Sequence, residues 1–180
     1  MVLDKSLDNN ERFVQNFRYY NSSVKGKENR ELIIVSVSIL DNILDEILKE
    51  KMSINENSII QIPRVSYLTK VDLCYKMRFI ESSLQKTLHL YGQLVDNFTK
   101  KDSLNSFNEL SVQTNILELC KLNDNEMFRL ILKLISKDER VEKEYYKIEE
   151  LIVDIGWSNV VKFICSIIQA SLIEALIKIK

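Results

Sequence analysis

The amino-acid sequence predicts an all-α protein, a single-domain helical bundle of about six to eight helices that spans residues 1–180. Hydrophobic residues make up 46% of the 180 residues and charged residues 28%, a balance that supports one buried core. The chain has only three glycines and one proline, whereas sheets joined by tight turns usually need more of both. Over long segments, apolar residues recur three and four positions apart, as on the buried face of a helix.

Five of the predicted helices lie in the first 122 residues. Their apolar spacing places them at residues 10–20, 28–52, 67–77, 83–99 and 110–122. Phe13, Phe17 and Tyr20 form the expected buried stripe of the first, and Ser66 is the expected N-cap of the third. Gly92 lies inside the fourth and predicts a close helix crossing, because glycine there costs up to about 1 kcal/mol relative to alanine.

The C-terminal third is expected to continue the helical pattern. A helix is predicted at residues 126–135 with Asp124 as its N-cap, and the highly charged segment 136–150 follows. Gly156 is the predicted C′ glycine that ends the next segment, and Ser158 is the predicted cap of the last helix.

Residues 160–179 are mostly apolar and about long enough to span a bilayer. Lys162, Gln169 and Glu174 lie inside this stretch, and each charge inside a span costs a few kcal/mol. We therefore expect a buried core helix. A C-terminal membrane anchor is the alternative, and a helix this apolar also suits the seam of a homodimer. The polar N-terminus shows no signal peptide, so a cytoplasmic location is predicted.

Charge and cysteine usage exclude several classes of protein. The net charge is −1 and the pI is about 6.0, without the positive excess that a general nucleic-acid-binding protein carries. Cys74, Cys120 and Cys165 are far apart and odd in number, which predicts reduced core thiols in a cytosolic protein. The paired C-x-x-C spacing of a zinc site is absent.

No catalytic constellation is visible. His89 is the only histidine, and the sequence contains no G-x-S-x-G, P-loop, H-E-x-x-H or EF-hand pattern. We expect His89 to be a partly exposed structural residue, since nothing local supports a dyad with Cys74. Asp41 and Asp45 are expected on a solvated acidic face, because the Glu-x-x-His partners of a helical metal site are missing. The sequence therefore predicts no catalytic residue, no metal ligand and no cofactor.

Residues 138–150 alternate in charge sign, which is typical of a solvated helix with many ion pairs. The segment also predicts a surface for docking a protein partner, because tyrosines supply binding hot spots and carboxylates steer a basic partner. The candidate partner-binding residues are Glu142, Glu144, Tyr145, Glu149 and Glu150.

Two segments, ELIIVSVSILDNILDEILKEKM and SYLTKVDLCYKMRFI, contain a pattern known from one family. The pattern is an aliphatic helix with L-D-x-x-L-x-x-x-L, followed by S-x-x-x-K/R-x-D-L-A-Y-x-L-G-x-I. Its residues here are Leu40, Asp41, Leu44, Leu48, Ser66, Lys70, Asp72, Leu73, Tyr75 and Ile80. On these positions, about a third of the chain resembles the mannitol operon repressor-like family, which implies an all-helical fold distantly related to the HEPN superfamily.

The resemblance also bears on catalysis. Active HEPN ribonucleases use an arginine followed four to six residues later by a histidine, and family members often show an R-N-x-x-A-H-like stretch. This chain has Asp96-Asn97-Phe98-Thr99-Lys100-Lys101 near that place, with neither the arginine nor the histidine, and His89 lies upstream. The resemblance therefore implies that the ribonuclease chemistry has been lost.

These observations predict a non-enzymatic protein that binds another macromolecule. One form is an immunity or antitoxin-type inhibitor that occludes a partner such as a basic toxin or nuclease. The other is a regulator like that of the resembled family. A divergent HEPN-like ribonuclease is the enzymatic alternative, and neither nucleic acid nor membrane is the expected partner.

Overall fold

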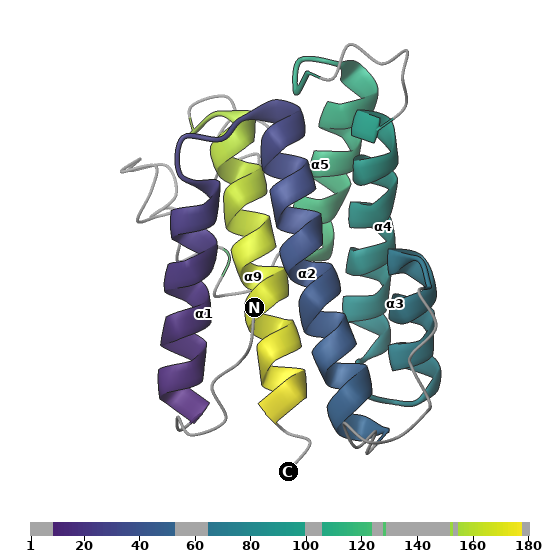
Figure 1. The fold of residues 1–180 in the computed structure, drawn as a ribbon. Helices are drawn as coiled ribbons and strands as arrows, with labels where there is room; N and C mark the ends of the chain where they lie inside the picture. The colour runs from purple at the N-terminus through teal and green to yellow at the C-terminus, as the bar shows by residue number, and fades with distance from the viewer. Residues whose placement is uncertain are drawn as a thin grey trace, which may run out of the picture.

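The computed structural model describes residues 9–52, 65–99, 106–123, 128, 152 and 155–177. Within these residues the chain forms six helices and no strand, which confirms the all-α prediction. The helices are α1 (Asn9–Val24), α2 (Asn29–Lys51), α3 (Tyr67–Lys76), α4 (Ser82–Thr99), α5 (Leu110–Leu122) and α9 (Trp157–Ile177). They stand side by side, with α9 between α1 and α2, and with α3 and α4 on the other side of α2 (Figure 1).

The helix α9 is central to the described part of the bundle. It packs most extensively against α2 and also contacts α1, α4 and α5. A helix that is covered on several sides has to be apolar on several sides, so its burial accounts for its composition. The same composition, with a mean hydropathy of 1.9 over its most apolar stretch, also makes α9 the one described helix that could cross a membrane by length and composition. Its packing within the bundle agrees with the expected core helix.

The buried stripe of α1 includes Tyr20 of the predicted one but not Phe17. Asn16, Tyr20 and Val24, spaced four residues apart, are buried, whereas Phe17 is 42% exposed. The predicted stripe is therefore correct at Tyr20 and wrong at Phe17, and the side chain of Phe13 lies outside the described residues. The buried face includes Asn16, a polar residue that hydrophobic spacing does not identify.

The same helix ends at Val24, beyond the predicted end at Tyr20. The hydroxyl groups of Ser22 and Ser23 both donate hydrogen bonds to the carbonyl oxygen of Tyr19. These small polar side chains bond back to the preceding turn instead of interrupting it. A polar run that suggests a loop in the sequence is therefore the last turn of α1.

Polar groups meet inside the bundle where α1, α2, α4 and α9 converge. The Tyr20 hydroxyl lies 3.3 Å from Ser36 Oγ and donates to the carbonyl oxygen of Lys162 at 3.2 Å. The Cys165 thiol interacts with Tyr20, Ser36 and Tyr91, and burial raises its pKa. Each of these groups is therefore uncharged, so the core holds hydrogen bonds without a buried charge at this point.

A second internal hydrogen bond links α9 to α1. The Gln169 side chain, which is 1% exposed, donates from Nε2 to the carbonyl oxygen of Asn16 at 3.2 Å. A buried amide needs such a partner, because an unsatisfied polar group in the core is costly.

Two predicted details of α3 and α4 are confirmed. Ser66 caps α3, since its Oγ accepts a hydrogen bond from the backbone N–H of Thr69 at 3.3 Å. At Gly92 of α4, an added Cβ would lie 2.6 Å from Cδ2 of Leu68 in α3. The glycine therefore permits the close crossing of the two helices.

The helix α3 ends in a turn at which Arg78 adopts a left-handed backbone conformation, with φ 59°. The N–H of Phe79 donates to the carbonyl of Cys74 at 2.8 Å, and the N–H of Arg78 donates to the carbonyl of Tyr75 at 2.9 Å. These are the two hydrogen bonds of a Schellman motif, whose left-handed position is usually occupied by glycine. An arginine there is strained, because its Cβ crowds the backbone.

Replacing Arg78 with glycine is expected to stabilise the protein by about 0.5–1 kcal/mol. Relief of the left-handed strain contributes about 1–2 kcal/mol, and the greater freedom of glycine in the unfolded chain offsets part of it. Urea unfolding measures the difference. The matched control is Arg78→Ala, which removes the guanidinium but keeps the strain. Equal stability of the two variants would contradict the prediction.

Gly156 separates α9 from the segment before it. Its φ is +86°, and its N–H donates to the carbonyl of Ile152 at 2.8 Å, which confirms the predicted left-handed C′ position. The prediction that Ser158 caps the last helix is wrong. The helix begins at Trp157, so Ser158 lies in its first turn, and its buried Oγ has no hydrogen-bond partner in the described structure.

Candidate binding surface on α3 and α4

The candidate surface lies on α3 and α4, and an ionic cluster holds α3 against α2. Lys70 Nζ lies 2.8 Å from Asp41 Oδ2 and 2.9 Å from Asp45 Oδ2, and the Lys70 side chain is only 8% exposed. Burial lowers the pKa of Lys70, but the hydrogen bonds and charges of the two carboxylates outweigh it and the pKa is raised. Lys70 therefore stays charged and fixes α3 against α2.

This cluster corrects the expectation of a solvated acidic face at Asp41 and Asp45. Both side chains are about one-third exposed and both bind the same ammonium group. The spacing of the two aspartates along α2 was visible in the sequence. Their partner on another helix was not.

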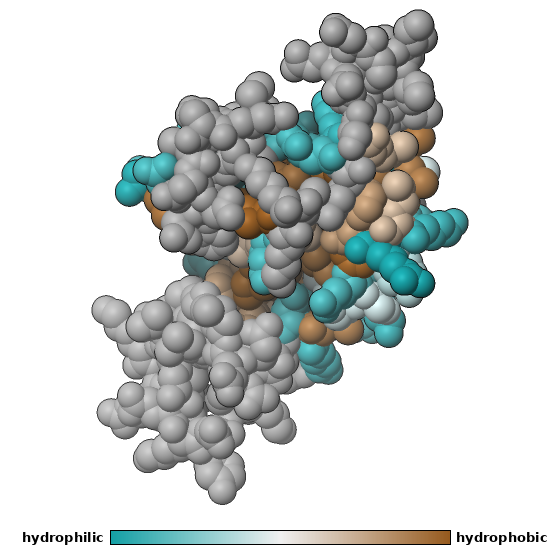
Figure 2. Space-filling view, turned by 90° about the horizontal axis from the view of Figure 1, so that it is seen from below, coloured by the Kyte–Doolittle hydropathy of each residue, from teal (hydrophilic) through white to brown (hydrophobic). Residues whose placement is uncertain are grey.

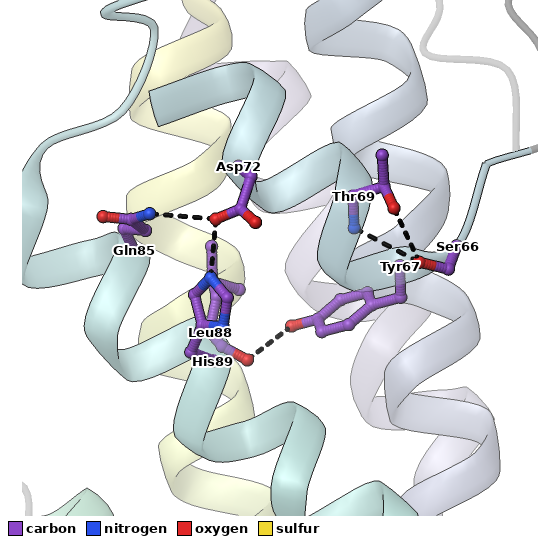
Figure 3. Close-up of polar contacts among 7 residues, drawn as sticks. All are labelled: Ser66, Tyr67, Thr69, Asp72, Gln85, Leu88 and His89. Atoms are coloured by element: carbon purple, nitrogen blue, oxygen red, sulfur yellow. Dashed lines mark hydrogen bonds and ion pairs between the residues drawn. The ribbon is translucent and has the colours of Figure 1, made fainter. Parts of the chain in front are cut away.

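A polar group of three side chains lies on the outer side of α3 and α4 (Figure 3). His89 Nε2 lies 2.7 Å from Asp72 Oδ1, and Gln85 Nε2 donates to the same oxygen at 3.0 Å. The hydrogen bond from His89, and to a smaller extent the one from Gln85, lowers the pKa of the Asp72 carboxyl. The His89 and Asp72 side chains are 37% and 42% exposed.

The arrangement of this group gives His89 a definite orientation. When Nε2 donates its proton to Asp72, the other ring nitrogen, Nδ1, is free to accept one. Close by, the Tyr67 hydroxyl donates to the carbonyl of Leu88 at 3.3 Å and ties the two helices together (Figure 3). The Asp72–His89 pair can therefore orient a polar group of a ligand or transfer a proton.

Large apolar side chains are exposed at the C-terminal end of α3. Leu73, Tyr75 and Met77 are 36%, 39% and 40% exposed. Viewed from below, the face that is not drawn in grey shows brown hydrophobic surface among teal polar side chains (Figure 2). Leu73 and Met77 are one turn apart and share a face of α3, and Tyr75 is exposed on another face of the same turn. Side chains of this size are usually more deeply buried, so this end of α3 is a candidate contact surface.

A cleft of about 570 Å³ adjoins this surface, between the α3–α4 turn and the C-terminal half of α9. It is lined by Tyr75, Arg78, Phe79, Ile80, Glu81, Ser83, Leu84, Ser171, Glu174 and Ala175. The strained turn at Arg78 thus forms part of a concave wall.

The cysteines have no access to this surface. Cys74, Cys120 and Cys165 are all free and buried, as predicted for core thiols. Burial, with a contribution from the Asp45 charge, raises the pKa of Cys74 to about 12. Because the thiolate is the nucleophilic form, Cys74 is a poor nucleophile at neutral pH, and a catalytic dyad with His89 is not supported.

The candidate residues Glu142, Glu144, Tyr145, Glu149 and Glu150, and the predicted helix at 126–135, lie outside the described residues apart from Phe128. The docking surface predicted there stays a prediction. Among the residues that the structure does describe, no three or more histidine, cysteine, aspartate or glutamate side chains are grouped so as to hold a metal ion.

Sequence reasoning missed the surface on α3 and α4. A signal was present, since Leu73 and Met77 are one turn apart and fall outside the buried positions Lys70, Val71 and Cys74. Hydrophobic spacing alone does not show which apolar residues of α3 stay exposed, and the contact between Asp72 and His89 joins residues 17 apart on two helices.

The fold and this surface define the chain as an all-α helical bundle with a mixed polar and apolar face on α3 and α4. Comparison with protein families, with curated proteins and with solved structures finds no match to this chain.

Proposed function

We propose that this chain is a non-enzymatic helical protein that binds a partner protein and occludes one of its surfaces. It would act as an immunity or antitoxin-type inhibitor or as a regulator of the mannitol operon repressor-like kind. The observation that carries the proposal is the exposure of Leu73, Tyr75 and Met77 beside the Asp72–His89 pair. Aromatic and methionine side chains are enriched in interface cores, and a polar group at the edge fixes the orientation of the partner.

The rigidity of α3 supports the proposal. Its first turn is capped by Ser66, its inner face is tied to α2 by Lys70, and its neighbour α4 approaches closely at Gly92. A surface that is already ordered loses little conformational entropy on binding, so more of the contact energy appears as affinity. The segment 138–150 is a second proposed contact, through which acidic side chains would attract a basic partner such as a toxin or nuclease.

Site-specific photocrosslinking in the producing cells tests this proposal. A photoreactive phenylalanine analogue at position 75 should yield a discrete crosslinked protein, whereas the same analogue at the exposed Leu110 of α5 should not. The crosslinked protein is then purified and its affinity measured. The double variant Leu73→Asp, Met77→Asp should weaken binding at least tenfold, because it places two charges in the apolar contact. Unchanged affinity would exclude this surface.

The second candidate function is a divergent HEPN-like ribonuclease, favoured by the 2.7 Å contact between His89 and Asp72. A histidine that is oriented by a carboxylate can take the proton from a ribose 2′-hydroxyl. The test is RNA cleavage by the purified protein and by His89→Ala and Asp72→Asn. Cleavage that is lost in both variants would replace the binding proposal with the enzymatic one. Equal cleavage by the wild-type protein and both variants would come from a contaminating ribonuclease.

A further inference from the structure

The cleft between the α3–α4 turn and α9 has the size and lining of a small-molecule site. Its volume of about 570 Å³ falls within the range of about 300–1,000 Å³ that is common for ligand sites. Phe79, Ile80, Leu84 and Ala175 supply an apolar wall, and the hydroxyl groups of Ser83 and Ser171 lie on its lining. The cleft therefore offers both contact area for an apolar body and a few polar groups for orientation.

The charges around the cleft are of both signs. Arg78 comes from the turn after α3, Glu81 from just before α4, and Glu174 from α9. The Arg78 guanidinium makes no hydrogen bond or ion pair with the described residues, so its five donors are available to an anionic group. The Glu81 carboxylate lies on the same lining, where it favours a cationic group.

The backbone at Arg78 is a second observation that points to the same residue. Its left-handed conformation suits glycine, so the turn itself gains nothing from an arginine. Residues with a strained backbone cluster at active sites and ligand sites. Here the strained residue is also the cation on the cleft wall.

We propose that this cleft binds a small zwitterionic molecule with an apolar body, of the class of aromatic or aliphatic α-amino acids. The carboxylate of the ligand pairs with Arg78, its ammonium group lies toward Glu81, and its side chain packs on the apolar wall. Tyr75 lines the cleft and also belongs to the proposed contact surface, whereas Leu73 and Met77 lie outside the cleft lining. Binding of a small molecule and binding of a protein partner are therefore measured separately, and the failure of one leaves the other standing.

Isothermal titration calorimetry of the full chain with three matched probes tests the proposal. The probes are L-phenylalanine, 3-phenylpropionate, which lacks the amine, and 2-phenylethylamine, which lacks the carboxylate. L-Phenylalanine should bind with a dissociation constant of roughly 1 mM or below, as expected for a ligand of this size, and at least tenfold more tightly than either of the others.

Two variants assign the contacts. Arg78→Gly should reduce the affinity for L-phenylalanine at least tenfold and leave 2-phenylethylamine unaffected, and Arg78→Lys should retain part of the affinity. The variant Glu81→Gln should reduce L-phenylalanine binding to the level of 3-phenylpropionate. Because Arg78→Gly is expected to stabilise the fold, its loss of binding is not a loss of structure. Absence of saturable binding, equal affinity for the three probes, or undiminished binding by Arg78→Gly would overturn the proposal.

Discussion

Replacing Ile168 with alanine is expected to lower the free energy of unfolding by about 3 kcal/mol. Ile168 is completely buried in α9, the helix that packs against α1, α2, α4 and α5. Truncating a buried isoleucine removes its transfer free energy and leaves a cavity that the surrounding helices fill only in part, for a total of about 2–5 kcal/mol. Urea unfolding followed by circular dichroism measures the loss.

The neighbouring isoleucine provides the control. Ile167 is only partly buried, so Ile167→Ala should cost about 1 kcal/mol with the same change in composition and helix propensity. A difference between the two variants shows that the fully buried positions of α9 carry the core packing. If Ile168→Ala left the unfolding free energy unchanged, α9 would not be a core helix, and the membrane-anchor interpretation would gain support.

Replacing Lys70 with methionine is expected to destabilise the protein by about 2–3 kcal/mol. The substitution keeps the length of the side chain but leaves Asp41 and Asp45 facing each other without their shared ammonium group. Removing one partner of a buried ion pair costs about 3–5 kcal/mol, and the partial exposure of the two carboxylates reduces that figure. Thermal and urea unfolding at neutral pH give the magnitude.

The pH dependence of this effect has a definite sign. The pKa of Lys70 is raised in the folded protein above its ordinary value of 10.5. Its contribution is therefore fully present below pH 10.5 and is lost as the pH rises through the folded pKa. The stability difference between the wild-type protein and Lys70→Met should be constant near neutral pH and should shrink above about pH 10.5.

A triple variant separates the lost attraction from the remaining repulsion. Adding Asp41→Asn and Asp45→Asn to Lys70→Met removes both charges at nearly the same shape. Most of the lost stability should return, because breaking such a cluster is worse than replacing it by neutral groups. A triple variant that is less stable than Lys70→Met would show that the carboxylates have another stabilising role.

The helices α2, α3, α4 and α5 could be predicted from the sequence because their apolar residues recur at helical spacing, and two local features add detail. Ser66 before α3 is a side-chain cap, and Gly92 marks a close approach that its missing Cβ permits. The same reasoning failed at the ends of α1 and α9. Ser22 and Ser23 satisfy carbonyls within α1, and Gly156 leaves Ser158 without a capping role.

The candidate site was harder to predict because its residues meet only across helices. Asp72 and His89 are 17 positions apart, and Lys70 is 29 positions from Asp41. Periodicity identifies which face of a helix is apolar, but it does not say which neighbour that face meets. The residue type does not predict the left-handed backbone at Arg78, since arginine rarely adopts this conformation.

The few polar side chains inside the bundle limit how α9 can be placed among its neighbouring helices. A helix that is apolar nearly all round can slide by one turn or rotate about its axis at little loss of hydrophobic contact. Cys165 and Gln169 break this degeneracy, because only one placement brings them to the hydroxyl of Tyr20 and the backbone oxygen of Asn16. A shifted placement would lose these contacts inside the core, so the two side chains favour a single register for the central helix.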